Sequence, residues 1–363
     1  MYYTATPLPD ELLSSWLIRS SILNGTDPLG FADGLWFNQR IWTKDLDRHL
    51  STDQIMQLKK NTNLSFEQIE NMTLEPIYKA LVHPHTVNPK KSWEYIIPTG
   101  IRNRTATNGL HFCPMCLQEP NPYMKKQWRL SWNCICEKHH ILLQLACSKC
   151  GHCFAPHLIA YTDTDFSRCQ YCQSSLIRGK MIPVSKSVLN LQSFLNRTIK
   201  ERQIPPHTYP IIDENAADLF ATARGLMLFF RDLIHAKIFQ PHAEYLFKEI
   251  GYHYEPVKRE DDSRQLSIDA LSSEKRHQLL DMVSHLLYFS LSDIVAILRE
   301  ADISKQLFMR SIKLHSPTLS HIANSLKERK RTANKEILRT YSDFQPRPKE
   351  EVELLMDEIR KYL

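Results

Sequence analysis

Apolar residues near the N-terminus recur on one face of a helix. Leu12, Leu13, Trp16 and Leu17 follow helical spacing, and the short polar residue Asp10 comes just before them. A side-chain oxygen at this position can accept a hydrogen bond from a free N–H of the first helical turn. We therefore expect a helix over residues 11–19, capped by Asp10, whose apolar face packs into a core.

Two helix-start patterns then follow in close succession. Ser51-Thr52-Asp53-Gln54 and Ser65-Phe66-Glu67-Gln68 both have the Ser-x-x-Gln form of a capping box, and the turn-forming Asn61-Thr62-Asn63 lies between them. The pattern predicts a helix-turn-helix pair over residues 52–73, joined by a shared apolar seam. The seam consists of Ile55, Leu58, Leu64, Ile69, Met72 and Leu74. Scaffold packing and contact with nucleic acid are both open as roles for this pair.

Helical periodicity is lost over residues 83–110, which include Asn88-Pro89-Lys90-Lys91. We expect an extended connector here and a domain boundary at its end. The His83-Pro84-His85 segment does not suit a metal-binding strand pair, because the proline interrupts the strand.

The C-terminal half regains helical periodicity from about Val188 onward. Its most specific part is a second helix-turn-helix pattern near residues 290–315, with one helix from Ser290 to Leu298, a turn at 301–304 and a second helix from Lys305 to Arg310. A third helix is expected to carry a basic cluster. The candidate residues for docking nucleic acid or a protein partner are Lys305, Gln306, Arg310, Lys313, Lys327, Arg329, Lys330 and Arg331. A solvated basic face is the alternative.

All nine cysteines lie between Cys113 and Cys172, and this clustering favours metal binding over a disulfide scaffold. A knuckle is a tight turn with two residues between two ligands, which directs both side chains at one ion. The cysteines form two sets, each with two such knuckles. The first set is Cys113, Cys116, Cys136 and His139, and the second is Cys147, Cys150, Cys169 and Cys172. A site with four protein ligands leaves no open position, so we expect two structural Zn²⁺ ions.

The ligand register has alternatives. Cys134 and Cys153 are left over, and Cys150-Gly151-His152-Cys153 also has knuckle spacing. Rival ligands are His140, His152 and His157. Between the first two knuckles, the partly alternating apolar and polar residues 123–132 predict a short hairpin. The fold class is thus mainly α with a small zinc-ribbon (α+β) middle, and the domains are 1–110, 111–180 and 181–363.

Composition narrows the function classes. The net charge of +6 is compatible with a polyanionic partner but too small to require one. The start of the chain lacks the charged and apolar regions of a signal peptide, and we expect a cytoplasmic protein without a membrane span. There is no Gly-x-x-x-x-Gly-Lys-Ser/Thr loop and no Gly-x-Ser-x-Gly elbow, and no catalytic residues are predicted.

Several separated segments resemble the TniQ/TnsD family of transposon target-selection proteins, in the order that the family has them. The resemblance covers roughly residues 5–175, and the length is closer to the compact TniQ type. The segments are 7–19, Met72-Thr73-Leu74, Cys113-Pro114-Met115-Cys116-Leu117, Trp128, Cys136-Glu137-Lys138-His139 and Cys147-Ser148-Lys149-Cys150-Gly151. The extra Cys134 and Cys153 depart from the pattern.

The resemblance implies a non-enzymatic adaptor in transposition and DNA integration. Such an adaptor links a target-marking element to the AAA+ ATPase TnsC, which brings in the transposase. In some compact members the marking element is a guide-RNA CRISPR effector complex such as Cascade, often bound by a homodimer. The alternatives are a direct reader of attachment-site DNA, a zinc-dependent transcription regulator, and a DNA-cutting or DNA-joining enzyme with an accessory zinc ribbon.

Overall fold

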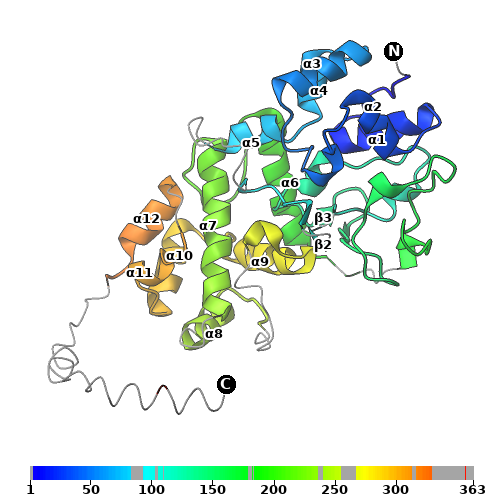
Figure 1. Cartoon of the computed structure of the whole chain (residues 1–363). Coiled ribbons are helices and arrows are strands. Elements are labelled where there is room, and N and C mark those ends of the chain that lie inside the picture. The colour runs from blue at the N-terminus through cyan, green and yellow to red at the C-terminus, as the bar shows by residue number, and fades with distance from the viewer. Residues whose placement is uncertain are drawn as a thin grey trace. The chain divides into compact units, whose positions relative to one another are not determined.

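Helices dominate the described part of the chain, and the β-structure consists of two short two-stranded sheets. The computed structural model describes residues 3–82, 93–102, 105–108, 110–178, 182, 184–235, 240–254, 267–312, 316–328 and 356. The chain divides into two units, Met1–Lys327 and Glu328–Leu363, and almost all described residues belong to the first unit. Figure 1 shows the arrangement of this first unit, with a long central helix between two groups of elements.

Six short helices form the N-terminal part. They are α1 (Leu13–Leu23), α2 (Pro28–Leu35), the 3-10 helix η1 (Ile41–Thr43), α3 (Thr52–Asn61), α4 (Phe66–Asn71) and α5 (Glu75–Leu81). The helices from α1 through α4 share a separate hydrophobic core, whose large side chains include Trp16, Phe31 and Trp36. Both predicted capping boxes are present, at Ser51 for α3 and at Ser65 for α4. Two helices therefore lie where the pattern placed them, and the predicted seam residues share this core, except Leu74, which belongs to the larger core. The helix-turn-helix motif and contact with nucleic acid remain predictions.

The predicted cap of the first helix is wrong. Helix α1 begins at Leu13, and no side chain of the preceding segment caps it. Asp10 has a left-handed backbone (φ 59°), and its carboxylate accepts a hydrogen bond from the N–H of Gln127 instead. A residue distant in the sequence accepts hydrogen bonds from the first turn of α1 instead: the Asp47 carboxylate accepts from both the N–H and the hydroxyl of Ser14. A tertiary contact has replaced the local cap.

The middle of the chain contains the two small sheets. Strands β1 (Gly100–Arg102) and β2 (Thr105–Asn108) pair antiparallel inside the expected connector, and β3 (Ile135–Cys136) pairs antiparallel with β4 (Ile141–Leu142). The 3-10 helices are η3 (Cys116–Gln118), η4 (Lys126–Arg129), η5 (Pro156–Leu158) and η6 (Leu176–Arg178). The hairpin predicted over residues 123–132 is wrong, because η4 turns the chain there and buries the adjacent Trp128 and Arg129 together.

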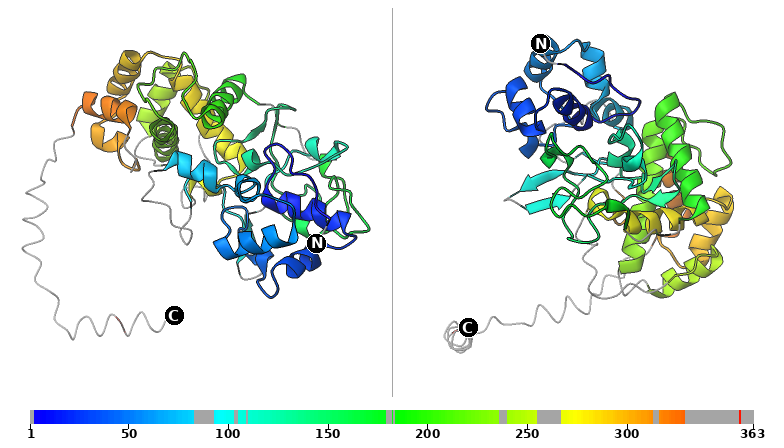
Figure 2. Two further views of the ribbon diagram at one scale, coloured as in Figure 1. Left: turned by 90° about the horizontal axis from the view of Figure 1, so that it is seen from above. Right: turned by 90° about the vertical axis from the view of Figure 1, so that its right-hand side faces the viewer.

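The C-terminal part of the first unit is helical, as predicted. Its elements are α6 (Lys186–Glu201), α7 (Ala216–His235), α8 (Gln240–Glu249), the 3-10 helix η9 (Ile268–Ala270), α9 (Ser273–Leu286), α10 (Leu291–Glu300), α11 (Lys305–Phe308) and α12 (Pro317–Ser325). Helix α7 contacts α5, α6, α8, α9 and α12, and both views in Figure 2 place it inside this group. Gly225 allows the close approach of α12, since a Cβ there would lie 2.6 Å from Leu319 Cδ1.

The second helix-turn-helix pattern is only partly realised. Helix α10 and the following turn are where the pattern placed them, but α11 ends at Phe308 and is a single turn, so Arg310 lies beyond it. Helix α12 ends at Ser325, and Lys327 follows the third helix instead of lying on it. Ser290, Ser304 and Ser316 cap the starts of α10, α11 and α12, and α11 and α12 end earlier than the pattern predicted. Lys313, Arg329, Lys330, Arg331 and the His83-Pro84-His85 segment lie outside the described residues.

A second and larger core includes residues from all three predicted domains, such as Leu12, Trp128 and Phe230. The domain boundaries remain predictions. In the part of the chain that the structure describes, no single helix is long and apolar enough to span a membrane. One bent pair, α9 with α10 at 108°, passes the same test by length and composition alone.

Candidate metal centres

The first tetrad consists of Cys113, Cys116, Cys136 and His139, whose ligand atoms all lie within 4.8 Å of one another. His139 presents Nδ1 to the three sulfur atoms, at 3.4 Å from Cys113, 3.3 Å from Cys116 and 3.6 Å from Cys136. The Sγ atoms of Cys116 and Cys136 are 3.7 Å apart. The three cysteines are buried, and the histidine is half-buried.

These distances fit a tetrahedron around a zinc-sized ion. With Zn–S near 2.3 Å and Zn–N near 2.0 Å, a tetrahedral edge is about 3.8 Å between two sulfurs and about 3.5 Å between sulfur and nitrogen. The same spacing excludes a disulfide between Cys116 and Cys136, since bonded sulfurs lie about 2 Å apart. The tetrad can therefore hold a metal ion, and its donor set is consistent with zinc.

The second tetrad consists of Cys147, Cys150, Cys169 and Cys172. Its Sγ atoms are 3.7 Å apart between Cys147 and Cys172, and 3.6 Å apart between Cys150 and Cys169. These separations again match the edge of a zinc–thiolate tetrahedron. Cys150 and Cys172 are less buried than their partners, so one side of this site lies nearer to solvent than the other.

The same backbone hydrogen bond closes all four knuckles. The N–H of the residue after each knuckle donates to the carbonyl of the knuckle's first ligand, from Leu117 to Cys113, His140 to Cys136, Gly151 to Cys147 and Gln173 to Cys169. The three later donors have left-handed backbones, with φ of 52° at His140, 73° at Gly151 and 56° at Gln173. Each turn thus closes locally and brings its two ligands to one side, which is why the spacing alone predicts them.

The residues of the two predicted ligand sets form the two tetrads, and the ligand register itself remains a prediction. Cys134 is fully buried outside both tetrads, and burial raises the pKa of its thiol to about 12, so it is a neutral core residue. Cys153 is also outside the tetrads and lines a neighbouring pocket. Among the rival histidines, His140 is exposed, His152 stacks on Tyr171 at 4.3 Å and His157 stacks on Trp42 at 5.3 Å.

An acidic residue stands behind the histidine ligand of the first tetrad. Glu119 follows η3, the turn that continues from Cys116, and its Oε1 lies 3.7 Å from Nε2 of His139. Its other oxygen, Oε2, lies 2.7 Å from Nζ of Lys138. The Lys138 ammonium lowers the pKa of the Glu119 carboxyl through this contact, so the carboxylate is ionised at neutral pH.

Helices from the C-terminal part hold the strand that carries Cys136. The buried amide of Gln192 on α6 accepts from the N–H groups of Cys134 and Ile135, both at 3.0 Å, and donates to the carbonyl of Ile135 at 2.9 Å. On α9 the buried guanidinium of Arg276 donates to the carbonyls of Ser131 at 2.6 Å and Asn133 at 3.0 Å. These contacts were not apparent from the sequence, because they join segments 57 to 145 residues apart.

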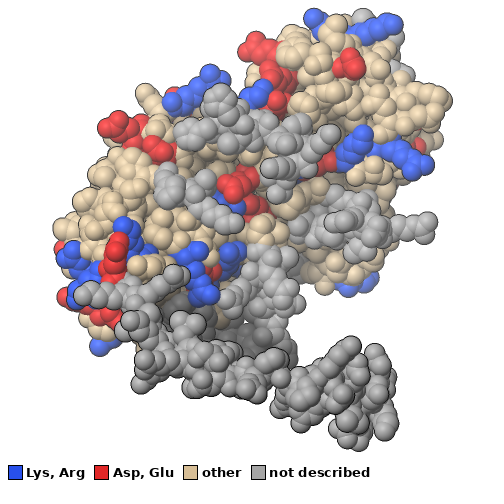
Figure 3. Space-filling view, turned by 60° about the vertical axis from the view of Figure 1, so that its left-hand side comes forward, with Lys and Arg blue, Asp and Glu red and all other residues tan. Residues whose placement is uncertain are grey.

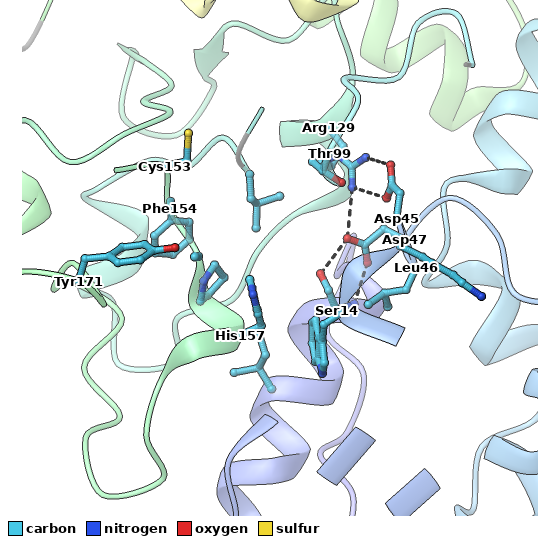
Figure 4. A pocket seen from close by; sticks show the side chains of 16 residues that line it. Ser14, Asp45, Leu46, Asp47, Thr99, Arg129, Cys153, Phe154, His157 and Tyr171 are labelled. Carbon is cyan, nitrogen blue, oxygen red and sulfur yellow. Dashed lines mark hydrogen bonds and ion pairs between the residues drawn. The ribbon is translucent and has the colours of Figure 1, made fainter. Parts of the chain in front are cut away.

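A pocket of about 110 Å³ lies between the N-terminal helices and the second cysteine-rich segment. One wall carries the Trp42–His157 stack, and the other carries the buried Arg129, which forms ion pairs with Asp45 at 2.6 Å and Asp47 at 3.3 Å (Figure 4). Burial raises the pKa of Asp47 to about 6, although Arg129 opposes this shift. The network connects η4 to the start of α1 through Ser14 and has a structural role.

The predicted docking residues that the structure describes lie around α11 and the end of α12. Gln306, Arg310 and Lys327 are exposed and Lys305 is half-buried, and the backbone N–H of Lys305 donates to the carbonyl of Lys327 at 3.0 Å. Figure 3 shows this side of the molecule with basic and acidic side chains intermixed. The structure brings the four residues into one region, and their role in docking remains a prediction.

The fold and the two tetrads define a mainly helical protein with two cysteine-rich clusters in the middle of its chain, each of which could hold a metal ion. The family model described as TniQ matches residues 2–143. The matched region includes the first tetrad and ends before the second. The predicted resemblance to the TniQ family is therefore confirmed over residues 2–143. TniQ proteins are non-enzymatic adaptors that act in target selection during transposition. Comparison with curated protein sequences gave no match.

Proposed function

We propose that this protein is a target-selection adaptor that links a guide-RNA CRISPR effector complex such as Cascade to the AAA+ regulator TnsC and, through it, to the transposase. The single observation that carries the proposal is the match of residues 2–143 to TniQ. The modest net charge of +6 favours an RNA-guided marking element over direct reading of DNA. The adaptor acts in the cytoplasm, and two copies can form a homodimer.

The two tetrads support this role as structural Zn²⁺ sites. Four protein ligands per ion leave no coordination position for water or substrate, so the zinc supplies folding free energy and no Lewis-acid chemistry. When bound, it fixes the turns that orient the surrounding segments. The residues that hold it are Cys113, Cys116, Cys136 and His139 in one site, and Cys147, Cys150, Cys169 and Cys172 in the other.

The partner surface is assigned to the C-terminal helices. Lys305, Gln306, Arg310 and Lys327 lie together around α11 and α12, where cationic side chains can meet phosphates or carboxylates. The basic residues Lys313, Arg329, Lys330 and Arg331 belong to the same stretch of sequence. The second candidate function, direct reading of attachment-site DNA, rests on the same residues, because α10 and α11 retain the order of a helix-turn-helix motif.

The deciding experiment is purification of the protein after co-expression with the genes that flank its own, followed by sequencing of any RNA retained after a high-salt wash. Guide-length CRISPR RNA together with the effector subunits is the expected result. A footprint on a specific chromosomal sequence, made by the protein alone and without RNA, would replace this proposal by direct DNA reading. Retention of TnsC on the tagged protein tests the second link of the adaptor.

Paired charge-removal variants locate the surface. Arg310→Ala with Lys327→Ala should weaken partner binding by about tenfold. It should also reduce the slope of the logarithm of the binding constant against the logarithm of the salt concentration by about 2. The matched control, Lys59→Ala with Lys60→Ala, removes two charges from the last turn of α3. If only the α3 variant loses binding, the N-terminal helix pair is the docking surface and the C-terminal assignment is wrong.

A further inference from the structure

The environment of His139 differs from that of every other tetrad ligand. It is the only nitrogen donor among the eight ligands, and an imidazole has a second nitrogen that a thiolate does not have. Nδ1 faces the three sulfur atoms at 3.3 to 3.6 Å, so Nε2 points away from the ion position. An imidazole that binds a metal through Nδ1 carries its proton on Nε2 and needs an acceptor there.

The carboxylate nearest to Nε2 is that of Glu119. Its Oε1 is the atom that lies 3.7 Å from Nε2 of His139, and this oxygen is buried with no hydrogen bond of its own in the structure. A buried carboxylate oxygen without a donor is costly, and a protonated Nε2 is the donor that faces it. At 3.7 Å the two atoms are beyond hydrogen-bond distance in the structure, but the unpaired oxygen and the orientation of the ring are independent observations that make Oε1 the nearest acceptor for a protonated Nε2.

Neighbouring contacts fix the carboxylate in this position. The backbone N–H of Glu119 donates to the carbonyl of Cys116 at 3.3 Å, which ties the residue to the first knuckle. Lys138, the residue before the histidine, lies 2.7 Å from the second carboxylate oxygen and balances its charge. The two residues that surround His139 therefore come from the two knuckles of its own site.

We propose that Glu119 is a positioning residue of the first metal site, which accepts the Nε2 proton of His139 and holds the ring with Nδ1 toward the ion. The inference rests on the proposed zinc sites. The second tetrad needs no such residue, because its four ligands are thiolates; the position three residues after Cys150, which corresponds to Glu119 after Cys116, is occupied by Cys153. The first site thus depends on Glu119, and the second does not.

The test uses the full-length protein loaded with ¹¹³Cd, because cadmium shifts separate a site with three sulfurs and one nitrogen from a site with four sulfurs. Glu119→Ala should weaken ion retention at the first site by about 10- to 100-fold in a chelator competition, the range found when such supporting contacts are removed. Retention at the second site should be unchanged. Glu119→Gln should be intermediate, because its amide oxygen can still accept the proton.

A matched control is Glu201→Gln, which removes a carboxylate that is likewise paired with one basic residue, Arg197, at 3.4 Å. This variant should leave both cadmium resonances and both retention constants unchanged. In ¹⁵N spectra, the wild type should show His139 bound through Nδ1 with a protonated Nε2, and the Nε2 proton should exchange faster in Glu119→Ala. A general loss of structure would disturb both metal sites instead of this one signal.

Two results separate the possible failures. If the protein binds two ions and Glu119→Ala holds the first as tightly as the wild type does, or if His139 binds through Nε2, the role of Glu119 is overturned and the zinc sites stand. If the purified protein binds no ion at the first tetrad, both the metal assignment and the role of Glu119 are overturned.

Discussion

Replacement of Gln192 by methionine tests whether the C-terminal helices stabilise the first metal site. The side chain is fully buried on α6 and makes three hydrogen bonds to the backbone around β3. Methionine has a similar volume and flexibility, so Gln192→Met removes the polar contacts with little change in packing. Two N–H groups and one carbonyl are then left unpaired in the core.

The magnitude follows from these three groups. Each unpaired buried group costs about 1 to 3 kcal/mol, and the two N–H groups share a single acceptor oxygen, so we expect a loss of about 4 kcal/mol in unfolding free energy. For a chain of this length, that loss lowers Tm by about 5 °C. Because Ile135 is next to Cys136, the ion in the first tetrad should also be released more readily than the ion in the second.

The assay is denaturant unfolding of the zinc-loaded protein, with chelator competition as a second readout. The control is Gln203→Met, the same substitution at an exposed position just after α6, which should change the unfolding free energy by less than about 0.5 kcal/mol. If Gln192→Met and Gln203→Met have the same stability as the wild type, the reasoning from buried hydrogen bonds is refuted at this position.

Two further predictions concern the metal content and the pH dependence. Cys113→Ser should reduce the zinc content from two ions to one per chain and partly unfold the middle of the chain, and elemental analysis that still finds two ions would contradict the ligand assignment. Burial lowers the pKa of His157 to about 4, below its usual 6.5, so the unfolded state binds more protons between these values and stability falls as the pH drops. From pH 7.5 to 5.5 the loss is about 1.3 kcal/mol. His157→Phe, which keeps the stack on Trp42, should remove this part of the slope, and an equal slope in both proteins would show that His157 is not responsible.

The features that depend on a few neighbouring residues were predicted correctly from the sequence. Each knuckle is closed by its own turn, so the spacing within Cys113-Pro114-Met115-Cys116 already contains the geometry of two ligands. The capping boxes at Ser51 and Ser65 are local in the same sense, and both are present. The family resemblance rested on these local segments together with the first helix, and the TniQ match covers most of them.

Contacts between distant segments did not follow from the sequence. The α1 start is satisfied by Asp47, 33 residues away from Ser14, so the local candidate Asp10 was wrong. Arg129 was assigned to a hairpin strand, but its partner Asp45 is 84 residues away, and that pairing favours a compact turn with the side chain inside the core. Glu119 was overlooked, although its position three residues after a ligand and Lys138 beside His139 were available as signals.

The closed turns of the knuckles indicate where a peptide tag can be inserted for experiments in living cells. The segment between Cys150 and Cys169 is exposed from residue 160 to residue 165, while each knuckle on either side of it is completed by its own backbone hydrogen bond. Doubling the length of such a loop raises its closure cost by only about 0.6 kcal/mol. A short epitope or fluorophore-accepting peptide inserted at Thr162-Asp163 would therefore report on the protein during integration while both ion-binding turns stay intact.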